Sequence, residues 1–481
     1  MARPHILLIT TDQWRWDFLD QRTVPGLRTP AIHGLMAAGT TLTHAYSNCP
    51  ICIPTRFTWA HGLYASQAAA DLMANWHDWP TRLPSMPQAL QRAGYHTALV
   101  GKLHSKEGLY HRDLCAPENI ADTRARGFDD VLEVCGKSLA FWFDCSWTRH
   151  LATRELLDAY RADLWRRCVR EGSRDDGAPS VLPSEDSMDS FIGRQARQWL
   201  ASYAGERPFF LHASFCGPHF PIDPPAEYHT RYRAEDMPIP AGVDDPETIR
   251  YYRQLGASYC ANIEHLDTEI GRLLAALESQ GLAAETVVLF ANDHGDMMGH
   301  HGQWGKGTAY DTSCRTPYIV RWPGQVPSGV VRESMVEAVD LPCTLLEIAG
   351  LSEPPTAYLP GTPGRSFLSY VRGETDAHRP WAYAEYSGWG VHWHMCCEPD
   401  WKYVMHLSGD DQLFNLTHDP WELHNLIDDP AQNVRVSRMR RQLLQSMAAC
   451  PAPNNIPQRP RDDWWLRTPA GEACCALEDA R

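Results

Sequence analysis

Groups able to bind a metal ion follow two apolar segments that lie far apart in the chain. Asp12 and Gln13 come just after one such segment, and Asp293 and His294 come just after another. Together they offer two carboxylates, an amide oxygen and an imidazole, an oxygen-rich set that suits a hard divalent cation better than zinc. A single Asp after a strand is more often a turn or cap residue, but its repetition favours a metal site. We expect Ca²⁺, with Mg²⁺ and Mn²⁺ as alternatives.

Four further residues carry groups suited to acid–base chemistry or to binding an anion. Lys102 and His104 are two positions apart in an extended segment, so their side chains would point the same way. His219 lies between two prolines, which would hold it in a rigid turn, and Lys306 lies between two glycines, which would let its ammonium approach an anion. Each residue alone is more often structural or solvated than catalytic. Their significance therefore depends on whether the fold brings them together.

Cys52 begins the run Cys52-Ile53-Pro54-Thr55-Arg56 and lies three positions after Cys49. The C-P-I-C spacing also occurs in redox pairs and in half of a zinc site. The chain contains no second C-x-x-C, which argues against a four-sulfur zinc site. The pair also lies in a proline-containing turn of a large chain, which is unlike a redox motif. A chemically modified nucleophile, a buried structural thiol and a redox pair remain open, in that order.

The composition excludes several kinds of partner. The chain has 481 residues, 43% of them hydrophobic, enough for one large domain and a smaller one. Its net charge of -15, without a long Lys/Arg run, argues against binding to nucleic acid or to an anionic membrane and favours small-molecule partners. The apolar stretch Ile6 to Ile9 is too short for a signal peptide or a membrane span. Fifteen cysteines without a secretory signal predict reduced thiols in the cytoplasm.

Apolar runs of strand length recur along the chain, and each ends near candidate residues. Continuous apolar runs separated by helical patterns are typical of a sheet buried on both faces, so we predict an α/β fold with a large mixed sheet sandwiched by helices. Because sites in such sheets form beyond the carboxyl ends of the strands, the runs should direct their polar residues into one crevice. The runs are Ile6 to Thr11, Thr97 to Val100, Phe209 to Phe215 and Val287 to Ala291; helices are predicted at Ile32 to Ala38, Pro87 to Ala93, Ser190 to Tyr203 and Tyr259 to Ser279.

The pattern changes near Glu374 to short aromatic-rich stretches, such as Trp381 to Tyr386 and Trp401 to His406. These predict a small α+β subdomain, a four-stranded antiparallel sheet with a closing helix at Asn433 to Ala449. The tail beyond it has several prolines and few periodic apolar positions, which indicates an arm that crosses the surface or reaches a neighbouring subunit in a homo-oligomer. The predicted parts are a catalytic α/β domain at 1–373, the subdomain at 374–450 and the arm at 451–481.

Six segments, in order, resemble motifs of the formylglycine-dependent sulfatase family within the alkaline phosphatase superfamily. The run from Cys52 to Arg56 is similar to the family's core signature, C-x-P-S/T-R, which marks the cysteine for oxidation to formylglycine. The family motif usually continues with Thr-Gly, where this chain has His61-Gly62. The resemblance extends over nearly the whole chain. The matching segments are residues 6–17, 52–56, 93–104, 215–221, 292–306 and 419–426.

The resemblance implies a sulfuric ester hydrolase that cleaves a sulfate monoester through a covalent sulfo-enzyme intermediate. The nucleophile would be the hydrate of the formylglycine made from Cys52 by a formylglycine-generating enzyme. One of its two hydroxyls would attack, and the other would later expel sulfate. The metal ligands implied are Asp12, Gln13, Asp293, His294 and an oxygen of modified Cys52.

The resemblance also assigns catalytic roles to residues of other segments. Arg56 would hold the formylglycine hydrate, while Lys102 and Lys306 would neutralise the non-bridging oxygens of the ester. His219 would be the general acid for the departing alcohol, shared with Lys306. His104 would be the base for the second hydroxyl.

Gln13 replaces the second Asp of the common Asp-Asp pair, a variant found in several sulfatase branches and also in phosphonate monoester hydrolases, which resemble this chain at 293–306 as well. A phosphonate monoester or phosphodiester hydrolase with the same site is therefore the alternative. Lys102 and His104 match the sulfatase pair and favour the first interpretation. A non-catalytic anion-binding relative is a third, which the retention of every candidate catalytic residue argues against. Residues predicted to contact a sugar or aryl ring of the substrate are Asn75, Trp76, Trp393 and His394.

Overall fold

A computed structural model of the chain describes residues 3–19, 24–68, 73, 77–80, 83–106, 111–170, 174–388 and 390–449. The predicted substrate contacts Asn75 and Trp76 and the predicted arm at 451–481 lie outside the described residues. Among the helices of the described part, none combines the length and the apolar character that a membrane span requires.

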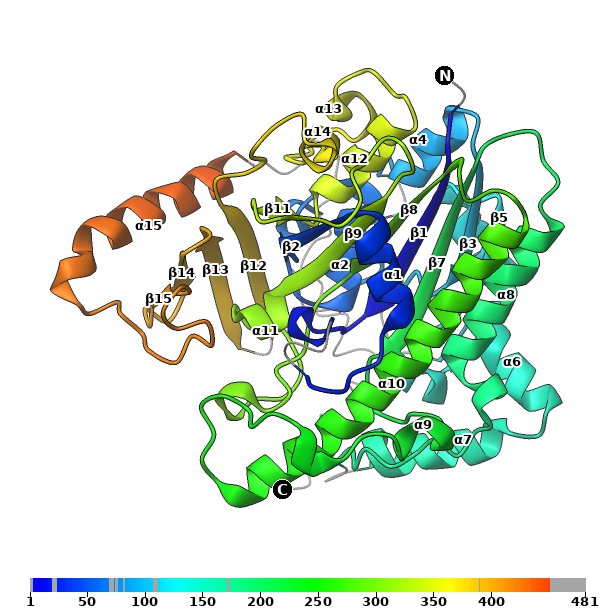
Figure 1. The fold of residues 1–481 in the computed structure, drawn as a ribbon, viewed down its shortest axis with the longest axis horizontal. Coiled ribbons are helices and arrows are strands. Elements are labelled where there is room, and N and C mark those ends of the chain that lie inside the picture. The colour runs from blue at the N-terminus through cyan, green and yellow to red at the C-terminus, as the bar shows by residue number, and fades with distance from the viewer. Residues whose placement is uncertain are drawn as a thin grey trace, which may run out of the picture.

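A 9-stranded mixed sheet forms the centre of the molecule (Figure 1). Its middle four strands, in the order β8-β1-β7-β3, are parallel and contain the four apolar runs predicted as strands. The full path is β10 (Val330–Arg332), β2 (Thr40–Tyr46), β9 (Arg315–Arg321), β8 (Thr286–Asn292), β1 (His5–Asp12), β7 (Phe209–Pro218), β3 (His96–Gly101) and β5 (Asp130–Glu133), with β11 (Val336–Glu337) beside β2. Only β9 runs antiparallel to its neighbours β2 and β8 among these paired strands, which confirms the mixed sheet.

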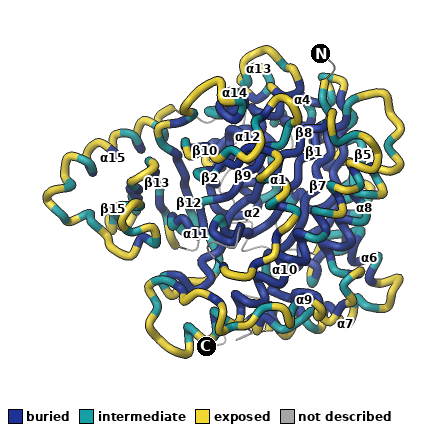
Figure 2. Tube along the Cα trace, in the orientation of Figure 1, coloured by how far each residue is buried: buried dark blue, intermediate teal, exposed yellow. Residues whose placement is uncertain are grey.

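Two apolar cores lie on opposite faces of the sheet, because successive residues of a strand point to opposite sides. Ile6 and Leu8 of β1 belong to one core, and Leu7 and Ile9 belong to the other. Burial is accordingly deepest along the central strands (Figure 2). The first core includes residues of α2 (Cys52–His61), α4 (Met86–Arg92) and α12 (Asp340–Ile348), and the second includes residues of α1 (Pro30–Ala38), α8 (Met188–Ser202) and α10 (Pro246–Ser279).

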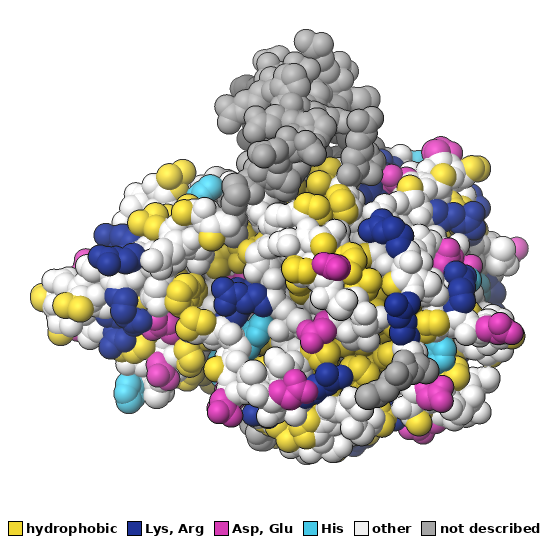
Figure 3. Space-filling model, turned by 90° about the horizontal axis from the view of Figure 1, so that it is seen from above, with side chains coloured by type: hydrophobic (Ala, Val, Ile, Leu, Met, Phe, Trp, Pro, Cys, Tyr) yellow, Lys and Arg dark blue, Asp and Glu magenta, His cyan; other side chains and the backbone are white. Residues whose placement is uncertain are grey.

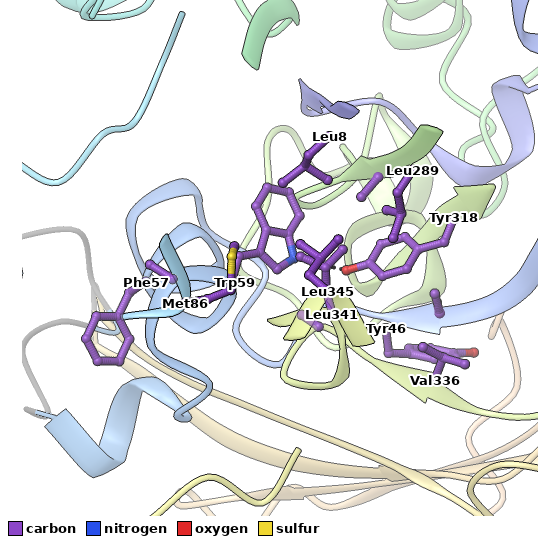
Figure 4. Close-up of a cluster of buried hydrophobic side chains, with 14 of the residues drawn as sticks. Leu8, Tyr46, Phe57, Trp59, Met86, Leu289, Tyr318, Val336, Leu341 and Leu345 are labelled. Atoms are coloured by element: carbon purple, nitrogen blue, oxygen red, sulfur yellow. Dashed lines mark hydrogen bonds between the residues drawn. The ribbon is translucent and has the colours of Figure 1, made fainter. Parts of the chain in front are cut away.

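Helix α2 is anchored in the first core by Trp59. Its indole N–H donates to the hydroxyl of Tyr318 in β9, at 3.0 Å, with Leu341 and Leu345 of α12 close by (Figure 4). Buried tyrosine and tryptophan side chains require such polar partners. The bond ties α2 to the sheet, and with it Cys52 at the start of the helix.

Helix α10 begins at Pro246, well before the predicted start at Tyr259. Asp245 caps it by accepting a hydrogen bond from the backbone N–H of Thr248 at 2.8 Å, and proline suits the first helical position. Gly256 lowers the helix propensity of this part. Burial of Leu255 in the second core helps to stabilise this part of the helix.

The C-terminal part confirms the predicted four-stranded antiparallel sheet and closing helix. The strands are β12 (Ala382–Gly388), β13 (Val391–Cys397), β14 (Trp401–His406) and β15 (Gln412–Asn415), in that order. Helix α15 (Asn433–Ala448) contributes Val436, Met439 and Leu443 to a third, smaller core that includes Cys396, Tyr403 and Leu413 of the sheet.

Candidate active site

The candidate residues meet at the carboxyl edge of the parallel strands. Asp12 is the last residue of β1, and Lys102, His219 and Asp293 directly follow β3, β7 and β8. Helix α2 adds Cys52 as its first residue. This convergence is the geometry expected for a site in a sheet of this type.

Four side chains form a buried group able to bind a metal ion. Ligand atoms of Asp12, Cys52, Asp293 and His294 all lie within 4.8 Å of one another. His294 Nδ1 lies 2.8 Å from the carbonyl oxygen of Gly295 and donates to it, which leaves a lone pair on Nε2. This Nε2 is 3.1 Å from Cys52 Sγ and 3.6 Å from Asp12 Oδ1. Burial also lowers the pKa of His294 to about 4, so the ring is neutral, as a metal ligand must be.

Hydrogen bonds hold both the backbone and the side chain of Gln13. It adopts a φ of 67°, its backbone N–H donates to Asp293 at 3.0 Å, and its carbonyl oxygen accepts from the hydroxyl of Tyr259. The side-chain Nε2 donates to Asp296, while Oε1 accepts from Lys306 Nζ at 2.8 Å. The amide oxygen is thus turned toward the site, which suits a neutral ligand. Asp296 and Tyr259 are contributors that the sequence analysis missed; in the sequence, only the second Asp of the run Asp-His-Gly-Asp hints at one of them.

Arg56 lies one helical turn after Cys52 and is buried with it. Its Nε donates to Asp293 Oδ2 at 3.0 Å, and its Nη2 lies 3.4 Å from Asp12 Oδ2. Its Nη1 donates to the backbone oxygen of Lys102 at 2.7 Å. The positive charge of Arg56 therefore partly balances the negative charges of both carboxylates of the candidate metal site.

Lys102 provides a second buried cation by donating from Nζ to Asp12 Oδ2. Burial by itself would raise the pKa of Asp12, but the charges of Lys102 and Arg56 hold that pKa well below its usual range. The carboxylate is therefore ionised. The pKa of the Cys52 thiol, in contrast, is raised by burial and by the nearby charge of Asp12.

Lys306 bridges the nucleophile position and His219. Its Nζ lies 3.1 Å from Cys52 Sγ and 2.8 Å from His219 Nε2. His219 Nδ1 donates to the carbonyl oxygen of Phe220 at 2.6 Å, so Nε2 accepts the hydrogen bond from Lys306. Burial and the charge of Lys306 lower the pKa of His219 well below its ordinary value. The pair can pass a proton between an ammonium and an imidazole.

His104 follows β3 at a φ of 60°, in the left-handed region. Strand β3 ends at Gly101, so Lys102 and His104 lie beyond it rather than within the predicted extended segment. Within the described part of the chain, the buried Nδ1 of His104 has no hydrogen-bond partner. Burial, followed by the charges of Lys102 and Arg56, lowers the pKa of His104 well below its ordinary value. The imidazole is neutral and able to accept a proton.

The remaining candidates lie around the site. Cys49 is a free thiol whose Sγ contacts the backbone oxygen of Met73, and it is not bonded to Cys52. Trp393 is 1% exposed, and its indole N–H donates to the backbone oxygen of Gly307 at 3.0 Å. His394, on the same strand, is half-buried.

Comparison with known proteins supports the family resemblance. The sulfatase family model matches residues 4–351, and a model described as N-sulphoglucosamine sulphohydrolase, C-terminal, matches residues 299–449. An arylsulfatase of Clostridium perfringens (strain 13 / Type A) is 27% identical over 476 residues, covering 92% of this chain and 94% of its own length. A multifunctional alkaline phosphatase superfamily protein of Trinickia caryophylli is 28% identical, covering 90% and 92%.

The fold is shared with solved structures. The phosphonate monoester hydrolase from Silicibacter pomeroyi superposes with a TM-score of 0.78 at 24% identity, covering 94% of this chain and 96% of its own. The sulfatase family model spans most of the chain. This enzyme therefore belongs to the sulfatase family of the alkaline phosphatase superfamily.

Proposed function

We propose that this enzyme hydrolyses a sulfate monoester and that Cys52, converted to formylglycine, supplies the nucleophile. The observation that carries the proposal is the position of Cys52 Sγ, which lies 3.1 Å from both His294 Nε2 and Lys306 Nζ and 3.5 Å from Asp12. In this unmodified chain, the sulfur stands for an oxygen of the formylglycine hydrate. The hydrate would supply a geminal diol, one hydroxyl for attack and one for release of the product.

The residues around this position fit a divalent cation. Asp12, Gln13, Asp293 and His294 would hold it together with the modified side chain at position 52, and this oxygen-rich set favours Ca²⁺, with Mg²⁺ and Mn²⁺ as alternatives. A bound cation would stabilise charge on the oxygens of the ester.

Lysine, arginine and histidine side chains of this enzyme perform the remaining steps in the proposal. Lys102 and Lys306 neutralise the non-bridging oxygens of the ester, and Arg56 holds the hydrate while it compensates the metal-binding carboxylates. His219 delivers a proton from Nε2 to the departing alcohol, with Lys306 as its neighbour and proton source at 2.8 Å. His104 accepts the proton of the second hydroxyl, a role that its unpartnered Nδ1 supports.

Formation of the nucleophile requires a partner enzyme. The side chain of Cys52 is almost completely buried, so a formylglycine-generating enzyme would act on the chain before it folds. The free thiols of the described cysteines are compatible with the cytoplasm predicted from the sequence. The C-terminal match to N-sulphoglucosamine sulphohydrolase supports a sulfated carbohydrate as the substrate, with a small sulfate ester as the alternative. His394 is the described candidate for contacting the substrate ring.

A second candidate function is hydrolysis of a phosphonate monoester or phosphodiester by the same site. The specific observation in its favour is Gln13, a neutral ligand where a second carboxylate is common, together with a relative that is named multifunctional. Sulfate monoesters and phosphodiesters both present a singly charged tetrahedral centre. The two cationic side chains would therefore accept either.

The test combines peptide mass spectrometry with an activity panel. Protein made with and without a co-expressed formylglycine-generating enzyme is digested, and the mass of the peptide that contains Cys52 is measured. Rates on an aryl sulfate and on an aryl phenylphosphonate are then compared for wild type, Cys52→Ala and the control Cys49→Ala.

Activity should increase with the converted fraction, be absent in Cys52→Ala and persist in Cys49→Ala, with the aryl sulfate as the better substrate. A fully active protein with an unmodified thiol would refute the nucleophile. Faster turnover of the phosphonate would favour the second function. Inactivity of converted, metal-replete protein on both esters would indicate a binding protein.

A further inference from the structure

Lys306 occupies a backbone segment with unusual freedom. It lies between Gly305 and Gly307, whose φ angles are 79° and 83°, in the left-handed region that glycine adopts without strain. Its ammonium nevertheless contacts three groups of the site, Gln13, Cys52 and His219. A side chain on so permissive a backbone needs external contacts to stay in place.

Hydrogen bonds with three different segments hold the backbone around Lys306: two involve the peptide groups on its two sides, and the third involves the next peptide, between residues 307 and 308. The backbone N–H of Met297 donates to Gly305 O at 2.6 Å, and Gly307 N donates to Pro50 O at 3.2 Å. The third bond comes from a side chain: Trp393 Nε1 donates to Gly307 O at 3.0 Å.

The C-terminal sheet encloses Gly307 closely. Trp393 lies in β13, and Tyr386 of the neighbouring strand β12 packs beside it with ring centroids 6.1 Å apart. A Cβ added at Gly307 would come within 3.1 Å of the Tyr386 ring. The backbone of Gly307 is therefore fitted against these two aromatic side chains.

The next residues of the chain are anchored to the same sheet. Lys402 of β14 donates from Nζ to Ala309 O at 2.9 Å and to Asp311 Oδ1 at 2.6 Å. Side chains of the C-terminal sheet thus hydrogen-bond to the segment 307–311 at both of its ends. The segment leads into α11 (Asp311–Cys314) (Figure 1).

We infer that Trp393 is a positioning residue: its indole N–H fixes the Gly307 peptide and thereby holds the Lys306 ammonium at the anion-binding position. Trp393 acts through the backbone rather than by stacking on a substrate ring, since its side chain is almost fully buried. The inference rests on the proposed role of Lys306. It makes the C-terminal sheet a part of the catalytic apparatus.

The test replaces the N–H while the aromatic bulk is kept. Trp393→Phe is compared with Trp401→Phe, the same change on the neighbouring strand β14, where the ring packs against Arg435 instead. Binding of inorganic sulfate is measured by calorimetry, which needs no turnover, and kcat and KM for an aryl sulfate are measured in parallel. Both substitutions are made in wild type and in Lys306→Ala.

Trp393→Phe should weaken sulfate binding and lower kcat/KM by about 10-fold or more, because a misplacement of about 1 Å can cost about 100-fold in rate. In the Lys306→Ala background, Trp393→Phe should cause no further loss of sulfate affinity or kcat/KM, since the ammonium that Trp393 positions is already absent. Trp401→Phe should behave as wild type in both backgrounds. If Trp393→Phe does not fold, benzothienylalanine at position 393, an isostere of tryptophan without the N–H, replaces it.

An equal loss in the two backgrounds would show a general structural effect and overturn the inference, as would unchanged sulfate binding in Trp393→Phe. A different result would contradict the proposed function itself. If Lys306→Ala alone binds sulfate and turns over as wild type does, then the role of Lys306 itself is wrong.

Discussion

Asp12 is the residue on which most of the candidate site depends. Its carboxylate contacts Lys102 and Arg56, with His219 and His294 within about 4 Å. Two buried carboxylates at this point, from Asp12 and Asp293, would be costly without compensating charge. Nearby cationic side chains supply part of that compensation, and a divalent cation would supply the rest.

A divalent cation bound at the candidate site should stabilise the folded protein, and Asp12→Asn should remove this effect. A ligand that binds only the folded state at a concentration of about 100 times its Kd stabilises that state by about 2.7 kcal/mol. We expect Ca²⁺ added to chelator-treated wild type to raise the Tm, and to leave the Tm of Asp12→Asn unchanged. The control is Asp17→Asn, where a carboxylate that pairs with Arg15 is lost and the four candidate ligands remain. An equal rise of Tm in Asp12→Asn would place the ion elsewhere.

His219→Ala should slow substrates according to their leaving groups. An alkoxide needs a proton as it departs, whereas a nitrophenolate does not, so loss of the general acid should lower kcat by about 100- to 10,000-fold for an alkyl sulfate and far less for nitrophenyl sulfate. Rates on the two esters, measured for wild type and variant, test this. His300→Ala is the control, since His300 also lies in this region but bonds to Arg15. Equal losses on both esters would assign His219 to binding instead.

At the scale of elements, helix α2 and the strand ends work together. The helix presents Cys52 and Arg56 on one face, one turn apart, because residues four positions apart are neighbours on a helix. The parallel strands β1, β3, β7 and β8 then bring carboxylates and cations to that face.

Glu133 of β5 should make stability depend on pH. It is buried and accepts a hydrogen bond from Thr123 of α5 (Pro117–Ala125) at 2.9 Å, and burial raises its pKa to about 7. Since the folded state holds this proton more tightly than the unfolded state, stability falls as pH rises from about 4.5, the unfolded pKa, to about 7.

Glu133→Gln removes this titration. Relative to wild type it should gain about 2–3 kcal/mol of unfolding free energy between pH 5 and pH 8, measured by urea denaturation. Glu118→Gln, an exposed change on α5, should show no such gain. A constant difference between Glu133→Gln and wild type across this range would contradict the assignment.

At the scale of the whole molecule, a buried triad joins the C-terminal sheet to the larger α/β part. Lys402 Nζ donates to Asp311 Oδ1 and Glu422 Oε1, both at 2.6 Å, and Asp311 lies just beyond the Lys306 segment. On the face drawn in Figure 3, positive and negative side chains are interspersed over the described surface. The triad at the junction, in contrast, pairs its charges in the interior of the molecule.

Lys402→Met should be strongly destabilising because Glu422 loses its cationic partner, while Asp311 keeps, among the described residues, only its ion pair with Arg315, at 3.4 Å. Breaking one partner of a buried ion pair typically costs about 3–5 kcal/mol. Denaturant unfolding of wild type, Lys402→Met and the control Lys106→Met measures this; Lys106 pairs with Asp122 closer to the surface, at 2.7 Å. Adding Glu422→Gln to Lys402→Met should recover part of the loss. A cost for Lys402→Met no larger than that of Lys106→Met would contradict the role of the triad.

Most of the architecture could be predicted from local sequence. Runs such as Val287 to Ala291 are continuous and apolar because a central strand is buried on both faces, and that pattern identifies the strand without any knowledge of its neighbours. The start of α10 was predicted too late in the chain, although Asp245 and Pro246 form a local start signal, because Gly256 interrupts the helical pattern that follows them.

The sequence by itself determined the identities of the candidate nucleophile, metal ligands and cations, because motif and residue type are local properties. Only the tertiary structure decided how they are held: Asp296 orients the Gln13 amide, and Trp393 holds the Gly307 peptide beside Lys306. These partners are separated by many residues in the chain. They meet because strands and sheets pack against one another. A local pattern of residues does not show which side chain from a distant part of the sequence will contact a given residue.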